Sequence, residues 1–385
     1  MVRLTPEQEE FRREVREFLA EERVRKCVDE IEHYRPREEP AHLDVYRWLG
    51  ERGWLAANWP VEYGGLGRTV VESAIVTEEM ALAGVPDDAH VLSIDIVGLF
   101  LLMVGTDAQK QRYLPALARG ESIATVLYTE PHCGSDLAAL TTRAEPDGDG
   151  AWRISGRKIY NQKSQFGDVA LCAARTTDSE VRFHGITLFL VPLRSPGVTI
   201  APVPSMENNR FNEIVIDGVR LTREHVVGPV DEGWQLINQM LLLERTGLDF
   251  HGKIRRWFDL VLAAARRSGQ LADPGYAQAI ADLDGRLRAG RAMAWRMVGN
   301  LARGTPDPVA SAAAKWFVTE QAKAVVRLGA EIGGLDALLS TWDGGALDNG
   351  LLEAAYRTAP TLTLASGTSE IMLYLIASTG LELFA

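Results

Sequence analysis

A small polar loop in the middle of the chain has the composition of a ligand-binding segment. It reads YTEPHCGSD, residues 128–136, and it gathers glycine, serine, threonine and two acids into nine residues. Backbone N–H groups and hydroxyls in such a loop can hydrogen-bond an anionic or heteroaromatic ligand. A plain β-turn has the same composition, so the loop alone does not decide between a binding site and a structural turn.

A second polar run, ASGTSEIM at residues 365–372, interrupts a helical stretch near the carboxyl end. Its glycine and hydroxyl groups suit contact with a ligand. The Ser366 hydroxyl, however, cannot accept a proton without a base of its own, and no histidine or lysine lies close to it in sequence. Proton transfer at this run therefore requires a base from another part of the chain.

Glu244 is the candidate for that base. At about 100° per residue it shares one face of a predicted helix over residues 231–252 with Ile237, Met240, Leu241, Gly247 and Leu248. Burial in this apolar stripe would raise the pKa of the carboxyl toward that of a working general base. Gly247 removes a side chain where a thin ligand could pass. The alternative is a buried structural acid paired with an arginine.

Composition and charge exclude several other classes of protein. The 385 residues are 46% apolar and 24% charged, as in ordinary globular chains of two or three domains. The net charge of −11 is spread along the chain and gives no electrostatic footprint for nucleic acid or an acidic membrane. The seven histidines are scattered and no metal-binding motif is present, so we expect no metal site.

The cysteines and the apolar runs indicate a cytoplasmic protein. Cys27, Cys133 and Cys172 are far apart and odd in number, which argues against a disulfide framework. The amino terminus is charged and amphipathic, and Asp95 interrupts the most apolar run, around residues 91–105. We therefore expect neither export nor a membrane span.

Three regions with different secondary-structure patterns follow one another along the chain. The elements of these regions must position the residues described above. Residues 1–120 show helical periodicity, beginning with the capping pattern Thr5-Pro6-Glu7. Residues 121–228 form short β-rich runs separated by glycine, proline and Asp-Gly pairs, which predicts six or more strands of an antiparallel barrel or sandwich. Residues 229–385 return to long helical segments, which predicts a four-helix bundle. The fold class is α+β with three domains.

Ordered motifs along the whole chain resemble the acyl-CoA dehydrogenase family. YTEPHCGSD resembles its flavin-binding TEPxAGSD segment, and six further pieces look like its markers in the expected order: NWPVEYGGLG (58–67), GTDAQKQRYLPALARGES (105–122), GRKIYNQ (156–162), FNEIVIDGVRL (211–221), GPVDEGW (228–234) and GTSEIM (367–372). The resemblance implies a helical domain, a middle β-domain and a carboxyl-terminal helical bundle, with FAD as cofactor.

The resemblance also implies which residues hold the flavin and the substrate. Four residues of the first loop would contact the flavin or the thioester end of the substrate: Tyr128, Thr129, Gly134 and Ser135. Tyr160 stands where the family usually has tryptophan, Gln162 where it has serine or threonine, and Thr368 would meet the flavin from the carboxyl-terminal domain.

Family members oxidise a thioester by moving an α-proton to a carboxylate and a β-hydride to the flavin. In many of them the carboxylate precedes the Gly-Thr of the last motif, a position occupied here by Ser366, whose backbone N–H would still polarise the thioester oxygen. Glu244-Arg245 resembles the motif of isovaleryl-CoA and long-chain members, whose base comes from the upstream helix. Glu244 is then the predicted base, and Arg245 is expected to contact the substrate.

The expected partners are an acyl-CoA or carrier-bound substrate, an electron-transfer flavoprotein and further subunits. Homotetrameric relatives grip the adenine half of FAD across an interface with Arg-x-x-Phe-Gly and Gln-x-x-Gly-Gly segments. The corresponding segments here, residues 265–275 and 330–334, lack the phenylalanine-glycine pair and the glutamine. A homotetramer and a heteromer with a paralogous subunit both remain open. Two other functions also remain open, a flavin monooxygenase or N-hydroxylase on the same fold and a non-catalytic subunit of a heteromer.

Overall fold

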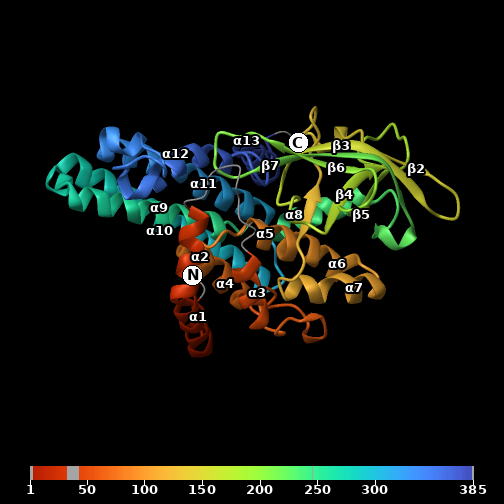
Figure 1. Cartoon of the computed structure of the whole chain (residues 1–385), viewed down its shortest axis with the longest axis horizontal. Coiled ribbons are helices and arrows are strands. Elements are labelled where there is room, and N and C mark those ends of the chain that lie inside the picture. The colour runs from red at the N-terminus through yellow and green to blue at the C-terminus, as the bar shows by residue number, and fades with distance from the viewer. Residues whose placement is uncertain (1–2, 33–42, 245, 384–385) are drawn as a thin grey trace.

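The computed structural model describes residues 3–32, 43–244 and 246–383, and for residues 241–244 it describes the backbone alone. Figure 1 shows three regions in succession: helices at the amino end, an eight-stranded sheet in the middle and long helices at the carboxyl end. The predicted fold class, with a β-domain between two helical domains, is confirmed.

The amino-terminal region is built of helices, and α1, α4 and α7 begin at capping boxes. The helices are α1 (Pro6–Leu19), α2 (Glu22–Glu32), α3 (Leu43–Glu51), α4 (Val70–Ala83), α5 (Asp88–His90), α6 (Leu99–Val104) and α7 (Asp107–Ala118), with a short 3-10 turn at Val61–Tyr63. The Thr5 side chain accepts a hydrogen bond from the Gln8 backbone, and the Gln8 side chain accepts one from the Thr5 backbone. Thr69 and Thr106 cap α4 and α7 with the same reciprocal pair.

The most apolar run, around residues 91–105, folds into two helical parts. Residues Val91–Gly98 form a π-helix, and α6 continues from Leu99. A π-helix carries an extra residue in each turn, which redirects the side chains around it and is often found at functional sites. This segment contributes Asp95 to a cavity described below.

The middle region is one sheet with the strand order β6-β7-β3-β2-β4-β5-β8, and β1 pairs with β4 off this path. Its strands are β1 (Ala124–Leu127), β2 (Arg143–Pro146), β3 (Trp152–Gln162), β4 (Val169–Arg175), β5 (Ile186–Pro192), β6 (Val198–Val203), β7 (Phe211–Leu221) and β8 (Val226–Val227). Most neighbours pair antiparallel, as predicted, but β1 and β2 each pair parallel with β4. Parallel pairing is possible because at least one other strand intervenes in sequence, so no tight hairpin has to join the pair.

The carboxyl-terminal region consists of α8 (Gly233–Glu244), α9 (Leu248–Arg267), α10 (Pro274–Ala302), α11 (Pro308–Gly333), α12 (Leu351–Leu362) and α13 (Ser369–Leu375). Short 3-10 turns lie between them at Gln270–Ala272, Gly334–Leu338 and Leu347–Gly350. α9, α10, α11 and α12 pack on one another around one apolar cluster. The helix breaks fall at proline and glycine clusters such as Asp273-Pro274-Gly275 and Gly304-Thr305-Pro306.

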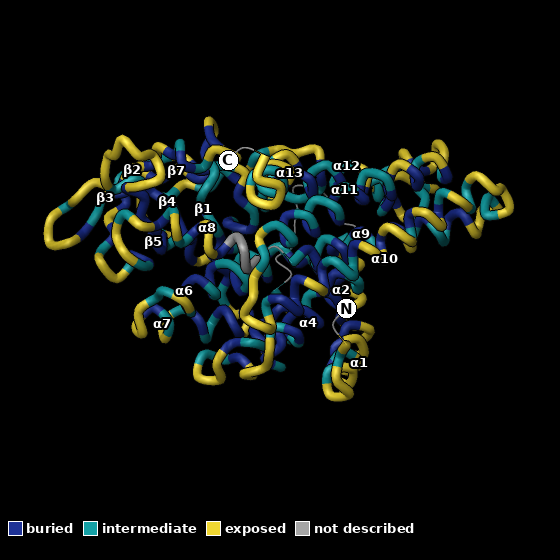
Figure 2. The backbone as a smooth tube through the Cα atoms, turned by 180° about the vertical axis from the view of Figure 1, so that it is seen from behind, coloured by how far each residue is buried: buried dark blue, intermediate teal, exposed yellow. Residues whose placement is uncertain are grey.

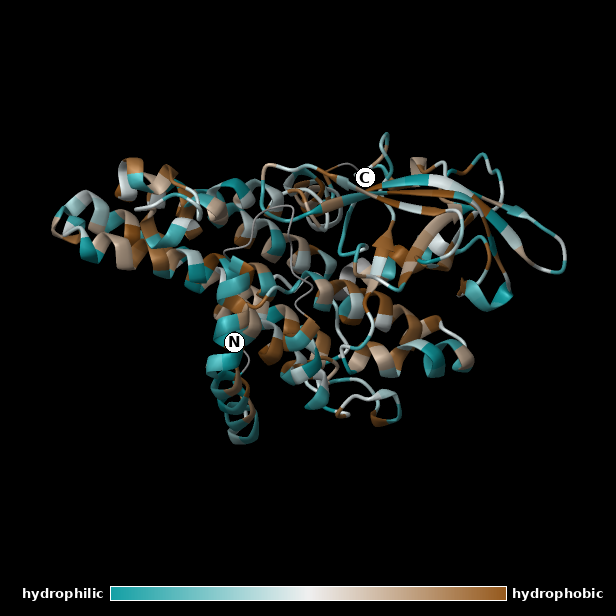
Figure 3. Cartoon of the chain, viewed as in Figure 1, coloured by the Kyte–Doolittle hydropathy of each residue, from teal (hydrophilic) through white to brown (hydrophobic). Residues whose placement is uncertain are grey.

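Burial is concentrated where the three regions meet. Figure 2 shows exposed residues at the outer hairpins of the sheet and at the ends of the long helices, and Figure 3 shows hydrophilic residues in the loop between β2 and β3. One apolar cluster combines amino-terminal helices with the inner face of the sheet and with Trp295 and Val298 of α10. The regions therefore share a core across their boundaries.

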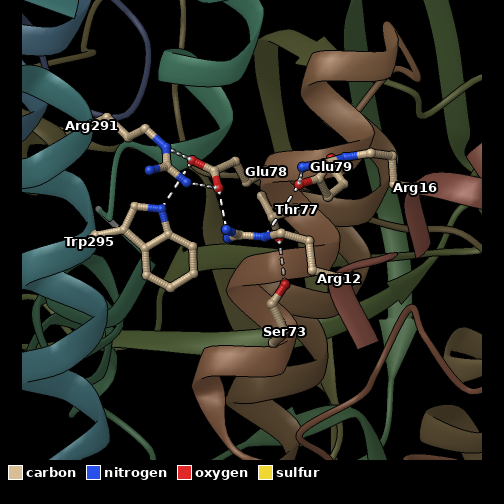
Figure 4. Close-up of polar contacts among 8 residues, drawn as sticks. All are labelled: Arg12, Arg16, Ser73, Thr77, Glu78, Glu79, Arg291 and Trp295. Carbon is tan, nitrogen blue, oxygen red and sulfur yellow. Dashed lines mark hydrogen bonds and ion pairs between the residues drawn. The ribbon is translucent and has the colours of Figure 1, made fainter. Parts of the chain in front are cut away.

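A buried carboxylate ties α1, α4 and α10 together (Figure 4). Glu78 of α4 accepts hydrogen bonds from Arg12 at 3.0 Å, from Arg291 at 2.8 Å and from the Trp295 indole at 3.0 Å. Burial opposes its ionisation, but the bonds and the charge of Arg291 outweigh burial and lower the pKa of Glu78. The neighbouring Glu79 pairs with α1 in a similar way.

A second buried acid lies where the sheet meets the carboxyl-terminal helices. Glu207, in the loop between β6 and β7, is only 4% exposed, and its Oε1 accepts a hydrogen bond of 3.3 Å from Thr361 of α12. Its Oε2 has no hydrogen-bond partner within the part of the chain that the structure describes. Burial, reinforced by the nearby charge of Asp88, raises the pKa of Glu207 from 4.5 to about 7.

Glu207 makes stability depend on pH in a predictable direction. A raised pKa in the folded state means that the folded protein favours the protonated acid, so this contribution is present below pH 4.5 and is lost as pH rises through about 7. We expect Glu207→Gln to raise the free energy of unfolding at pH 8 by up to about 3 kcal/mol and to change it little at pH 4.5. Urea unfolding at both pH values measures this difference, and an equal effect at the two would contradict it.

Candidate functional site

The first polar loop is fixed by a buried ion pair. Lys158 of β3 is fully buried, and its Nζ donates to the backbone oxygen of Tyr128 at 3.0 Å and to Glu130 Oε1 at 2.9 Å. Glu130 also accepts hydrogen bonds from the backbone N–H groups of Thr141 and Thr142, at 2.7 and 2.9 Å. Burial opposes ionisation of Glu130, but the charge of Lys158 and these bonds lower its pKa to about 2.

The loop lies beside the second group of predicted flavin residues. The Ile159 backbone N–H donates to the Thr129 oxygen at 3.1 Å, and Thr125 of β1 donates to the Gln162 oxygen at 2.9 Å. Between these contacts the pairing of β3 with β7 shifts register, and Tyr160 adopts a left-handed φ of +59°. This conformation is strained for a bulky residue, and Tyr160 is 59% exposed. Tyr128, Thr129, Tyr160 and Gln162 therefore come from adjacent strand ends.

The carboxyl-terminal run is held from α11. Lys315, which is fully buried, donates from Nζ to the Gly367 oxygen at 2.7 Å. Ser366 and Gly367 have φ values of +52° and +92°, and they form the sharp turn that precedes α13. The Thr368 side chain accepts a hydrogen bond from the Ile371 backbone at 3.2 Å. Thr368 thus caps α13, a structural role that exists beside its predicted contact with the flavin.

A cavity of about 100 Å³ brings the last predicted group together. Its wall comes from α4, the π-helix, α9 and α10, and it also includes Ser366 and the two residues Thr246 and Gly247. A Cβ built on Gly247 meets no atom within 4 Å, so open space lies beside its backbone. Phe250, next to Lys315, continues the wall. The turn beyond α8 and the position that carries the base in many relatives therefore face one space.

Glu244 and Arg245, the predicted base and a predicted substrate contact, are described only in part or not at all. The backbone of Glu244 ends α8, but its side chain lies outside the described part, as does the whole of Arg245. The predicted burial of the Glu244 carboxyl stays a prediction. Gly134 and Ser135 lie in the exposed half of the first loop and are not part of the described cavity wall.

Sequence reasoning missed three residues: Lys158, Lys315 and Asp95 as a member of the cavity wall. Each is a charged residue within an otherwise apolar or strand-forming run, and this is the only signal that the sequence offers. The partners of Lys158 and Lys315 lie far away in the chain, and the cavity wall around Asp95 comes from distant segments, so these contacts appear only in the folded protein.

Glu130 also belongs to a group that resembles a metal site. Ligand atoms of Glu130, His132 and Cys133 lie within 4.8 Å of one another. The Glu130 oxygens already accept hydrogen bonds from Lys158, Thr141 and Thr142, and a cation would have to compete with the buried ammonium. The arrangement favours bracing of the loop. Among the described residues, no helix is both long and apolar enough to cross a membrane.

We expect removal of the buried ammonium to disrupt the loop. Lys158→Met leaves the Glu130 carboxylate buried without its counter-charge, which costs about 3–5 kcal/mol of stability. The double variant Lys158→Met with Glu130→Gln removes both charges and recovers much of this loss. Urea unfolding measures both effects. A single variant as stable as the wild type would show that the pair does not support the loop.

Comparison with known proteins agrees with this architecture. Sequence models of the acyl-CoA dehydrogenase N-terminal, middle and C-terminal domains match residues 5–121, 125–219 and 231–381. The acyl-CoA dehydrogenase FadE26 of Mycobacterium tuberculosis (strain ATCC 25618 / H37Rv) is 31% identical over 401 residues, covering 98% of each chain. FadE29 of the same organism is 30% identical over 98% of this chain and 97% of its own.

Two solved structures are similar over almost the whole chain. The Tcur3481-Tcur3483 steroid ACAD has a TM-score of 0.89 and 29% identity, covering 99% of this chain and 98% of that chain. A chain of the ChsE4-ChsE5 complex from Mycobacterium tuberculosis has a TM-score of 0.88 and 30% identity, with full coverage of both chains at 100%. With its three domains in the order of these relatives, the chain belongs to the acyl-CoA dehydrogenase family of oxidoreductases.

Proposed function

We propose that the protein catalyses FAD-dependent α,β-dehydrogenation of an acyl-CoA, or of a carrier-bound acyl thioester, with Glu244 as the α-proton base. One observation carries the proposal: Ser366 and the turn Thr246–Gly247, which begins two residues beyond Glu244, line the same cavity. In this proposal Glu244, at the end of α8, therefore acts in the cavity where Ser366 occupies the position of the base in many relatives. Membership in the family supports the reaction class.

The loops beside β1 and β3 fit a flavin ring. Tyr160 presents an exposed ring from a strained backbone position, and Gly134 and Ser135 lie in an exposed loop. We assign FAD binding to these residues together with Tyr128, Thr129, Gln162 and Thr368. When bound there, FAD supplies the acceptor for the hydride that leaves the β-carbon.

The chain's own groups then act on the thioester. Glu244 removes the α-proton while the electron pair of that C–H bond forms the new double bond, and Glu244 ends the step protonated. Negative charge that develops on the thioester oxygen is stabilised by the backbone N–H of Ser366, because main-chain polarisation does not depend on the side chain. Arg245 and Ser135 contact the substrate in this proposal.

A partner subunit and an electron-transfer flavoprotein complete the proposed system. Apolar side chains are exposed near the segment that lacks the family's adenine-binding glutamine, where Leu335 is 81% and Leu338 is 66% exposed. Exposed apolar groups of this size mark interaction surfaces. The names of two similar structures, the Tcur3481-Tcur3483 steroid ACAD and the ChsE4-ChsE5 complex, each combine two different chains. These observations support assembly with a paralogous chain.

The partner surface can be tested by a single charge. We expect co-expression with the product of a neighbouring paralogous gene to give a larger assembly with more FAD per chain. Leu338→Glu should weaken this assembly about tenfold or more, since it buries a charge in an apolar contact. Val181→Glu, at an equally apolar exposed position in the sheet region, is the control. A monomer that holds a full complement of FAD without any partner would contradict the proposal.

The base is tested by removing its charge. We expect Glu244→Gln to lower the rate of flavin reduction by an acyl-CoA about 10²–10⁴-fold, because the amide cannot accept the α-proton. Flavin content should persist. The measurement is anaerobic bleaching of the flavin absorbance with a panel of acyl-CoA substrates. Glu232→Gln, at an exposed acid just before α8, should retain the wild-type rate.

Normal flavin reduction by Glu244→Gln would reject this assignment. Protein that binds no FAD and instead requires external reduced flavin and oxygen would favour the monooxygenase alternative. A chain that bleaches only when its partner carries the working base would favour a non-catalytic subunit.

A further inference from the structure

The cavity wall contains an acid that the proposed dehydrogenation does not use. Asp95 lies in the π-helix Val91–Gly98, in the interior of the protein, yet its side chain is 32% exposed. The cavity accounts for this exposure, since Asp95 is part of its wall. Burial raises the pKa of Asp95, so a hydrogen-bond donor that enters the cavity would stabilise the ionised carboxylate.

A second buried acceptor faces Asp95. His90 is 1% exposed, and its Nε2 lies 2.8 Å from the carbonyl oxygen of Leu55. In the neutral ring Nε2 must then carry the proton, and Nδ1 presents a lone pair. Among the described residues Nδ1 has no hydrogen-bond partner, and it lies 3.7 Å from Asp95 Oδ2, too far for a hydrogen bond. In this tautomer the ring therefore gives the Asp95 carboxylate no hydrogen bond.

The remainder of the wall suits a carbon chain that ends in a polar group. α4 contributes the small residues Ser73 and Ala74, and α10 contributes the apolar Val298 and Leu301. Asp249 of α9 adds a second carboxylate. The described residues of the wall include no lysine or arginine, and Arg245 is not among the described residues. The carboxylates of Asp95 and Asp249 would repel an anionic acyl group, whereas a donor would meet acceptors.

We propose that Asp95 is a specificity-determining residue that selects acyl groups carrying a hydrogen-bond donor, either a hydroxyl or an ammonium group. This inference rests on the proposed function, since it concerns the substrate of the same cavity. A donor bound in the cavity gives the Asp95 carboxylate the hydrogen bond that His90, at 3.7 Å, does not provide. An acyl group of the same length without a donor does not supply this bond and binds less well.

Matched acyl-CoA substrates test this selection on the FAD-loaded protein with its partner subunit. Each chain length from four to eight carbons is offered in four forms: plain, ω-hydroxy, ω-amino and ω-carboxy. We expect the best donor-bearing form to exceed the plain form of equal length about tenfold or more in kcat/KM, and the ω-carboxy form to be poorest. Comparison of the ω-hydroxy with the ω-amino substrates shows whether the cavity prefers a neutral or a cationic hydrogen-bond donor.

Variants assign the effect to Asp95. Asp95→Leu should reduce the preference for a donor at least about fivefold, and Asp95→Asn, which keeps one acceptor oxygen, should reduce it less. A preference that disappears in Asp249→Asn but persists in Asp95→Leu would overturn the assignment. A wild-type protein that reduces its flavin equally well with plain and donor-bearing substrates would overturn the inference while leaving the dehydrogenase proposal intact.

Binding without turnover provides a separate measurement. S-alkyl-CoA thioethers with and without an ω-hydroxyl or ω-amino group cannot be oxidised at an α-carbon, and calorimetry gives their Kd values. We expect the wild type to bind the better donor-bearing thioether about tenfold more tightly than the plain one, and Asp95→Leu to lose this ratio. Equal Kd values in the wild type would overturn the inference about Asp95. Failure of every acyl-CoA to reduce the flavin would instead count against the proposed function, and the Kd comparison does not depend on it.

Discussion

The ion pair between Lys158 and Glu130 holds the predicted flavin loop in one conformation. A lysine in the interior is unfavourable unless its charge and its donors are satisfied, and here a carboxylate and the Tyr128 carbonyl do this. Glu130 in turn accepts from two backbone N–H groups on the chain segment that leads into β2. Three segments of the β-region are thereby fixed at one point, and none of them could move without leaving a buried charge unpaired.

The same principle operates at the other predicted contact with the flavin. Lys315 reaches from the long helix α11 to the Gly367 oxygen, in a turn where Ser366 and Gly367 both have positive φ. Such a turn has few regular hydrogen bonds of its own, so a buried ammonium on a rigid helix is an effective anchor. Both loops are therefore irregular in backbone but held by regular elements, as precise binding sites require.

The cavity results from packing between regions of the chain that are distant in sequence. α4 presents the small residues Ser73, Ala74 and Thr77 to it, and the next residue, Glu78, carries the ion pairs to α1 and α10. The π-helix adds an acid where an uninterrupted α-helix would set a different register of side chains. In a space of this kind, polar groups are few and each has a large effect on what binds, because little water is present to screen them.

Local sequence determined the regular elements and the order of the three regions. The capping residues Thr5, Thr69 and Thr106, the proline and glycine breaks and the β-rich runs act through contacts within a few residues, so they are visible before folding. The motif YTEPHCGSD and the family markers also indicated the loop to which we assign the flavin. This loop and the strand end with Tyr160 are the part of the candidate site that local sequence could indicate.

Tertiary structure alone decided what joins these parts. Lys158 and Glu130 are 28 positions apart, and Lys315 and Gly367 are 52 apart, so neither contact leaves a periodic trace in the sequence. The parallel pairing of β1 with β4 and the meeting of Asp95, Gly247 and Ser366 in one cavity likewise depend on how the chain returns to itself. Hydrogen bonds and burial between distant segments are set by packing of the whole chain, whereas capping and periodicity are set by neighbours.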